Sequence, residues 1–213
     1  MTKTGAYATG LLAAALAAGG AAHAANLVAD GDFNSPSGGS TFTTYDAGSS
    51  FGPWTVTSGS VDLIGGYWQS PTVGGGSVDV DGNSPGAFDQ AIATGSGSYT
   101  LTFDLSGNPD GPPQTKTLQV SVGGVTKTFT YQTGANTHAN MMYIPESLTF
   151  TASGPTTLTF TSLDGNNSPY GPVVADVAIG AVPEPASWAL MLLGLGAMGA
   201  SLRARRLRVA DAA

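Results

Sequence analysis

The sequence has 213 residues and no cysteine, which excludes disulfides, thiol catalysis and cysteine-ligated zinc. Basic residues are also scarce: between residues 26 and 182, two lysines face twelve acidic residues, a net charge of −10. Because so acidic a surface repels nucleic acid and anionic lipid, we predict no nucleic-acid partner. Charged residues make up only 10%, whereas glycine (31) and proline (13) are abundant. This composition favours short strands joined by turns over helix bundles.

The N-terminus has the features of a secretory signal peptide. Lys3 precedes an apolar stretch over residues 11–22, and Ala22-His23-Ala24 has the small-x-small pattern that signal peptidase recognises. We predict a signal peptide over residues 1–25, which signal peptidase removes near Ala22 and Ala24. The chain is therefore predicted to be exported.

The C-terminal region predicts a transmembrane helix. Residues 186–202 form an uncharged, mostly apolar stretch, and a helix of that length measures about 25 Å, enough for a thin bilayer. Arginines follow at 203, 205, 206 and 208. By the positive-inside rule these arginines stay in the cytoplasm, so the rest of the chain lies outside.

Pro183, Glu184 and Pro185 stand directly before this helix. The two prolines keep the chain extended there and accessible to a peptidase. Taken in order, Pro-Glu-Pro, the apolar segment and the arginines resemble the PEP-CTERM sorting signal over residues 181–208, which leaves a tail at 209–213. The resemblance implies a Gram-negative host in which an exosortase-like transpeptidase cleaves at Pro183, Glu184 and Pro185. The protein would then be anchored transiently in the inner membrane before reaching the cell surface or extracellular matrix, often alongside exopolysaccharide production.

Alternating apolar and polar residues dominate residues 26–180. The clearest run has Tyr99, Leu101, Phe103 and Leu105 on one face, which predicts a strand with one buried side. Gly123-Gly124 between two such runs is typical of a two-residue hairpin. Several short strands at this spacing, without helices or repeats, predict an all-β, two-layer antiparallel β-sandwich.

Segments throughout this region also resemble a known family. They are Asn26-Leu27-Val28, Gly31-Asp32-Phe33, Trp54-Thr55-Val56, the strand from Ser60 to Ile64, Ser77-Val78-Asp79-Val80-Asp81-Gly82, and the run from Phe103 to Gly111. Together they resemble the choice-of-anchor C family, which is similar to plant cell-wall proteins with galactose-binding-like jelly rolls. The resemblance implies that fold, but the family has no settled molecular function.

The candidate catalytic groups lack partners. Gly48-Ser49-Ser50-Phe51-Gly52 matches the G-x-S-x-G pattern, but that motif needs a following helix, and Pro53 comes next. His138 is the one histidine beyond the leader, and nothing in the sequence brings it to Ser50. No pair of carboxyl residues is singled out for glycosidase chemistry. We therefore predict no enzyme activity and no catalytic residues.

Oxygen-rich segments suit calcium better than other metals. Those at residues 79–83 and 104–110 are explained by turn formation alone. Galactose-binding-like modules often tie their first and last strands with a structural calcium, and the resemblance places this site at Asp32, Asn34 and Asp176. Asn34 stands where that motif has Glu, which lowers the negative charge, and solvated side chains remain the alternative.

Aromatic rings that can stack on sugars are the remaining candidates for a ligand site. We select Trp68, Tyr67 and Tyr170. Because Tyr67 and Trp68 are consecutive in an extended segment, one ring should face outward, and Trp68 is our choice. Trp54 fits the core. We predict a non-enzymatic domain that binds an exopolysaccharide or cell-wall glycan; the alternative is a structural envelope or biofilm matrix component without a specific glycan ligand.

Overall fold

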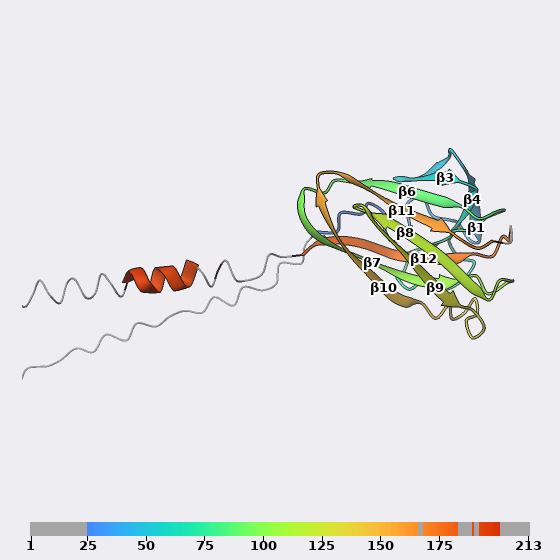
Figure 1. Cartoon of the computed structure of the whole chain (residues 1–213). Helices are drawn as coiled ribbons and strands as arrows, with labels where there is room; N and C mark the ends of the chain where they lie inside the picture. The colour runs from blue at the N-terminus through green and yellow to red at the C-terminus, as the bar shows by residue number, and fades with distance from the viewer. Residues whose placement is uncertain (1–24, 166–167, 183–188, 190–191, 201–213) are drawn as a thin grey trace, which may run out of the picture.

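The computed structural model describes residues 25–165, 168–182, 189 and 192–200 (Figure 1). The predicted cleavage residues Ala22 and Ala24, and the sorting residues Pro183, Glu184 and Pro185, lie outside the described residues. Of the predicted transmembrane segment, residues 189 and 192–200 are described and are helical. No helix within the described ranges is long and apolar enough to cross a membrane.

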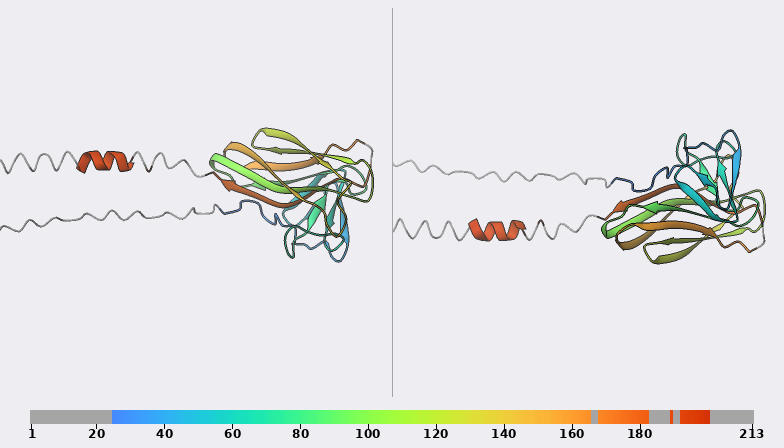
Figure 2. Two further views of the ribbon diagram at one scale, coloured as in Figure 1. Left: turned by 90° about the horizontal axis from the view of Figure 1, so that it is seen from below. Right: turned by 90° about the horizontal axis from the view of Figure 1, so that it is seen from above.

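Among the described residues, twelve strands form two six-stranded sheets, and every pairing of these strands is antiparallel. The first sheet has the order β1 (Phe42–Asp46), β4 (Ser60–Ile64), β5 (Ser77–Asp79), β12 (Pro172–Ala181), β7 (Ser96–Gly107) and β10 (Ile144–Ser153). The second has the order β2 (Ser50–Phe51), β3 (Trp54–Ser58), β6 (Ala87–Ile92), β11 (Thr156–Ser162), β8 (Thr115–Val122) and β9 (Val125–Gln132). The two layers are visible in Figure 2. The predicted all-β, two-layer antiparallel sandwich is therefore confirmed.

Strand alternation places the core between the sheets. Tyr99, Leu101, Phe103 and Leu105 of β7 are all buried, whereas Thr102 between them is exposed. The predicted hairpin joins β8 to β9 at Gly123 and Gly124, whose φ angles of 56° and 77° favour glycine. Both features follow from local residue patterns.

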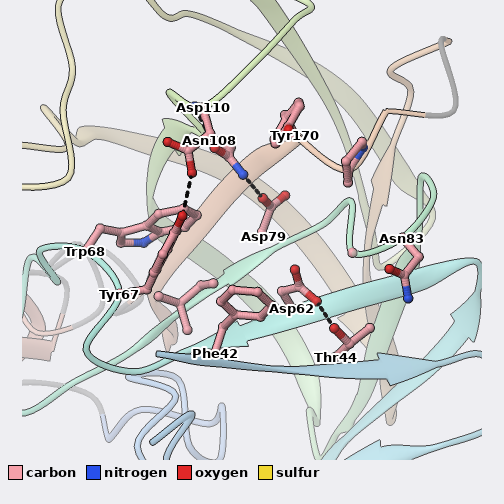
Figure 3. A pocket seen from close by; sticks show the side chains of 13 residues that line it. Phe42, Thr44, Asp62, Tyr67, Trp68, Asp79, Asn83, Asn108, Asp110 and Tyr170 are labelled. Atoms are coloured by element: carbon pink, nitrogen blue, oxygen red, sulfur yellow. Dashed lines mark hydrogen bonds between the residues drawn. The ribbon is translucent and has the colours of Figure 1, made fainter. Parts of the chain in front are cut away.

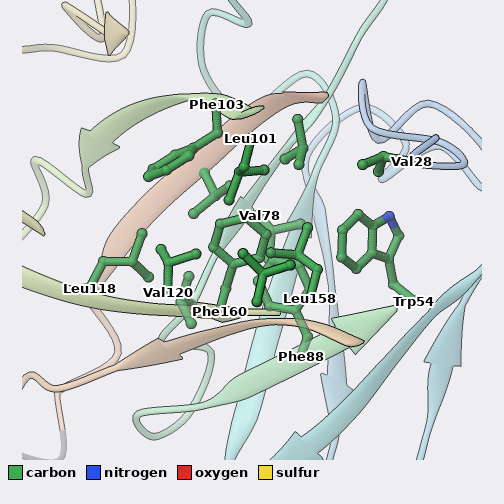
Figure 4. Packing of buried hydrophobic residues seen from close by; sticks show 14 of the residues in the cluster. Val28, Trp54, Val78, Phe88, Leu101, Phe103, Leu118, Val120, Leu158 and Phe160 are labelled. Atoms are coloured by element: carbon green, nitrogen blue, oxygen red, sulfur yellow. The ribbon is translucent and has the colours of Figure 1, made fainter. Parts of the chain in front are cut away.

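Aromatic side chains fill the centre of the sandwich (Figure 4). Trp54 is fully buried, as predicted, and its indole nitrogen donates a hydrogen bond to the Asp30 carbonyl at 3.1 Å. Phe88 stacks on Phe160 with ring centroids 5.2 Å apart, and Phe160 meets Phe103 edge to face at 5.5 Å. Burying each such ring contributes about 1.5–3 kcal/mol, so this cluster supplies a large share of the fold's stability.

Strand β12 runs from one end of the sandwich to the other. Pro172 pairs with Gly107 at one end, and Ala181 pairs with Tyr99 at the other. Ten residues of strand span about 33 Å. The loops that follow β7 and precede β12 therefore lie at the end opposite residue 181, as Figure 1 shows. We call this the distal end.

Candidate functional site

A pocket of about 170 Å³ opens at the distal end (Figure 3). We call it the distal pocket and define it by its thirteen lining residues: Phe42, Thr44, Asp62, Ile64, Tyr67, Trp68, Asp79, Gly82, Asn83, Asn108, Asp110, Pro169 and Tyr170. All three predicted ligand residues, Tyr67, Trp68 and Tyr170, belong to this set. The tertiary structure therefore brings together side chains that lie about 100 residues apart in the chain.

Tyr67 and Phe42 form one wall of the distal pocket. Their rings meet edge to face at 5.3 Å, and Phe42 is 43% exposed. The Tyr67 hydroxyl donates a hydrogen bond to Asp110 Oδ2 at 3.0 Å. This bond raises the pKa of Tyr67, with burial and the Asp110 charge acting in the same direction. The ring that is held at the surface is thus Tyr67.

Trp68 lies behind Tyr67, so our prediction that Trp68 is the outward ring is wrong. Trp68 is only 6% exposed and packs in a small apolar cluster with Ile64, Met141 and Val173. Its indole nitrogen donates to Ser77 Oγ at 2.9 Å. The large indole gains more from burial than the phenol does, and Ser77 satisfies its single donor.

Tyr170 forms the opposite wall. Its ring covers Gly111 so closely that a Cβ at residue 111 would stand 2.2 Å from Tyr170 Cδ2, which requires glycine there. The fully buried Lys116 ammonium donates to the Tyr170 carbonyl at 2.5 Å and the Gly111 carbonyl at 2.9 Å. Lys116 therefore ties together the two loops that build this wall.

Polar side chains form the floor. Asp62 Oδ1 accepts a hydrogen bond from Thr44 Oγ1 at 2.6 Å, and burial raises the pKa of Asp62. Asp79 accepts hydrogen bonds from Asn108 Nδ2 at 2.7 Å and from the Gly171 nitrogen at 3.0 Å. Burial nevertheless holds the pKa of Asp79 well above its usual range. The floor thus offers several hydrogen-bond acceptors, and burial disfavours the charged form of both of its carboxyl groups.

Two further acids, Asp81 and Asp164, lie near Lys116 and outside the lining of the pocket. Asp81 is fully buried and neither of its carboxylate oxygens has a hydrogen-bond partner within the described residues. Burial, followed by the nearby Asp164 charge, raises the pKa of Asp81 to about 7. Sequence reasoning missed this cluster because Asp79-Val80-Asp81 reads as an ordinary turn. The useful signal was Lys116, one of only two lysines between residues 26 and 182.

Comparison with known proteins assigns the body to a family. Residues 26–180 match the family described as "Protein of unknown function (DUF642)". The chain belongs to the DUF642 family. Residues 181–206 match the PEP-CTERM protein-sorting motif, which confirms that prediction. The matches do not name the choice-of-anchor C family.

A curated relative covers only part of this DUF642 chain. Halomucin of Haloquadratum walsbyi is 37% identical over an alignment of 90 residues, and the match covers 39% of this chain and 1% of halomucin. Among solved structures, TmCBM61 in complex with β-1,4-galactotriose has a TM-score of 0.49 and 17% identity, covering 74% of this chain and 99% of that one. A family 35 carbohydrate binding module from Clostridium thermocellum has a TM-score of 0.43 and 19% identity, covering 65% and 98%.

His138 contacts two of the residues that line the distal pocket in this DUF642 domain, Asp110 and Tyr67. Its Nε2 atom lies 2.6 Å from Asp110 Oδ1, and its ring centroid lies 4.6 Å from that of Tyr67. Ser50, by contrast, contacts Thr55 Oγ1 at 3.3 Å, and a turn and strand β3 follow it rather than a helix. The G-x-S-x-G match therefore does not form a nucleophile elbow.

The residues predicted to bind calcium lie where the segment before β1, around Gly31, meets β12. The Val177 nitrogen donates to the Gly31 carbonyl at 2.8 Å, so the neighbours Asp32 and Asp176 belong to adjoining segments. Asn34 Nδ2 donates to Asp32 Oδ2 at 2.6 Å, while Asp176 lies with Asp104 and Glu146 along another pocket. Within the described residues, no three His, Cys, Asp or Glu side chains group as metal ligands. Calcium at Asp32, Asn34 and Asp176 stays a prediction.

Proposed function

We propose that this DUF642 domain is a non-catalytic carbohydrate-binding domain, and that the distal pocket holds the sugar. The observation that carries the proposal is the pair of aromatic walls, Tyr67 and Tyr170, with Asp62, Asn83 and Asn108 between them. Aromatic faces bind the apolar faces of sugars, and amide or carboxylate groups bind their hydroxyls. Because about 170 Å³ is below the roughly 300–1,000 Å³ of ordinary ligand pockets, we expect one sugar unit to enter.

The position of the pocket supports this role. The PEP-CTERM motif implies export and surface sorting, and it begins at residue 181, at the end of β12. The distal pocket lies about 33 Å away, at the far end of the same strand. A domain held by its C-terminal side would thus present the pocket outward to a glycan.

Glycan retention tests the proposal. The full-length chain should be retained saturably on at least one exopolysaccharide or cell-wall glycan. Tyr67→Ala and Tyr170→Ala should each weaken retention, whereas Tyr67→Phe, which keeps the ring and loses the hydroxyl, should retain most of it. Melting curves of the same samples report whether each variant stays folded. Absence of retention on every glycan, with self-association instead, would favour the structural matrix role.

We further propose the route by which the protein reaches the surface. Signal peptidase removes the leader, the C-terminal segment holds the chain transiently in the inner membrane of a Gram-negative cell, and an exosortase-like transpeptidase cleaves near Pro183-Glu184-Pro185. Mass spectrometry of surface material from the native host tests this route. A mature protein that still carries residues 203–208 would contradict the cleavage and indicate a permanent anchor.

A further inference from the structure

The distal pocket is lined by acidic residues, and none of its thirteen lining residues is basic. Within the described ranges, three basic side chains occur, and each is engaged elsewhere. Lys116 donates to two backbone carbonyls, Lys127 lies 4.2 Å from the centre of the Phe129 ring, and His138 pairs with Asp110. A ligand that enters the pocket therefore meets carboxyl groups but no lysine or arginine among the lining residues, and Lys116, which lies near Asp79, is held by two backbone carbonyls.

Asp62 is the carboxylate best placed to receive a ligand. Asp110 already accepts from Tyr67 and His138, and both oxygens of Asp79 are hydrogen-bonded. Asp62 uses Oδ1 for Thr44, while Oδ2 makes no hydrogen bond within the described residues and turns from Thr44 into the pocket (Figure 3). One lone carboxylate oxygen, half-buried between aromatic walls, is thus available.

Resting on the proposed sugar-binding role, we infer that the distal pocket selects amino sugars whose amine is free and protonated, with Asp62 as the partner of the ammonium group. The ammonium compensates the charge of a carboxylate that is partly removed from water. Burial raises the pKa of Asp62, so a bound cation also favours its ionised form. An uncharged hydroxyl compensates this charge less well.

The aromatic wall favours the same ligand. Phe42 is 43% exposed beside Tyr67, and a cation near such ring faces gains further electrostatic attraction. A uronic acid would instead place its carboxylate beside Asp62 and Asp110, and like charges in close contact oppose binding. N-acetylation removes the cation while keeping the sugar ring, so acetylated sugars should bind more weakly.

Binding of matched oligosaccharides to the full-length chain tests the inference. The probes are hexamers of glucosamine and of galactosamine, their N-acetylated forms, and oligogalacturonate, compared at about pH 6, where amines are protonated and exposed carboxylates ionised. Within a sugar series, the amino form should bind at least about tenfold more tightly than the acetylated form, a difference of roughly 1.4 kcal/mol. Added salt should reduce this preference.

Two aspartate variants separate a local effect from a general charge effect. Asp62→Asn keeps an oxygen that can accept from Thr44 but removes the charge, so the preference for the amino form should fall to near one. Asp46→Asn removes an exposed carboxylate outside the pocket and should keep the preference. Equal or tighter binding of acetylated or uronate probes by the unmodified chain, or an unchanged preference in Asp62→Asn, would overturn the inference and leave sugar binding intact. If no glycan at all is retained, the proposed function itself fails.

Discussion

Replacing Asp81 by Asn should make the protein more stable at neutral and alkaline pH. Asp81 is fully buried, its two carboxylate oxygens have no hydrogen-bond partner within the described residues, and Asp164 lies near enough to repel it. The Ser162 hydroxyl, which lies outside regular hydrogen-bond geometry, and the Lys116 ammonium both favour the ionised form, yet burial prevails and the pKa of Asp81 rises to about 7. Removing a poorly compensated buried charge should therefore help the fold.

The pKa shift sets the size and sign of the effect. Asp81 titrates near 3.8 when unfolded and about 7 when folded, and about three units correspond to roughly 4 kcal/mol at 1.36 kcal/mol each. The folded state binds the Asp81 proton more tightly than the unfolded state does. The contribution of this proton to the free energy of unfolding is therefore complete below about pH 4 and is lost as the pH rises through about 7. In Asp81→Asn this loss is absent, although unsatisfied amide donors cost about 1–3 kcal/mol.

Thermal unfolding at about pH 5 and about pH 8 measures the effect. The melting temperature of Asp81→Asn relative to the unmodified chain should rise between these pH values, by several degrees given about 2–4 °C per kcal/mol. Asp46→Asn, at an exposed position, is the control and should follow the unmodified chain. Because Asp62, Asp79 and Asp164 titrate in both proteins, only the difference between the curves reports Asp81. Parallel curves for Asp81→Asn and the unmodified chain would refute the reasoning.

Three further changes test neighbouring features. Lys116→Met leaves two carbonyls and nearby acids without their cation, so the free energy of unfolding should fall by roughly 3–5 kcal/mol. The melting temperature and glycan retention should fall with it, and an unchanged melting temperature would contradict this. Trp68→Ala should cost about 3–5 kcal/mol, while Leu163→Ala, at a 45% exposed side chain, should cost little in the same denaturant titration. If Asp32, Asn34 and Asp176 bind calcium, a chelator should lower the melting temperature, since ligand at about a hundredfold excess over Kd contributes roughly 2.7 kcal/mol. Asp176→Ala should abolish that response, and a melt insensitive to chelator would argue against the site.

The sequence by itself determined the architecture, because sandwich strands follow from short-range patterns. The alternation from Tyr99 to Leu105 has a period of two residues, which assigns one face to the core whatever the strand's neighbours are. Gly123-Gly124 likewise encodes its turn locally, through φ angles that other residues avoid. The sorting motif at 181–206 is also a linear signal, read from residue order alone.

Only the tertiary structure decided which groups share the distal pocket and which ring faces it. Alternation correctly separated Tyr67 from Trp68 but could not choose between them, because the choice depends on an apolar cluster that Met141 and Val173 supply from distant segments. Lys116 shows the same limit: its partners Gly111 and Tyr170 meet only once β7, β8, β11 and β12 are packed. Backbone periodicity is set within a few residues of chain, whereas burial and charge at a site depend on contacts between segments far apart in sequence.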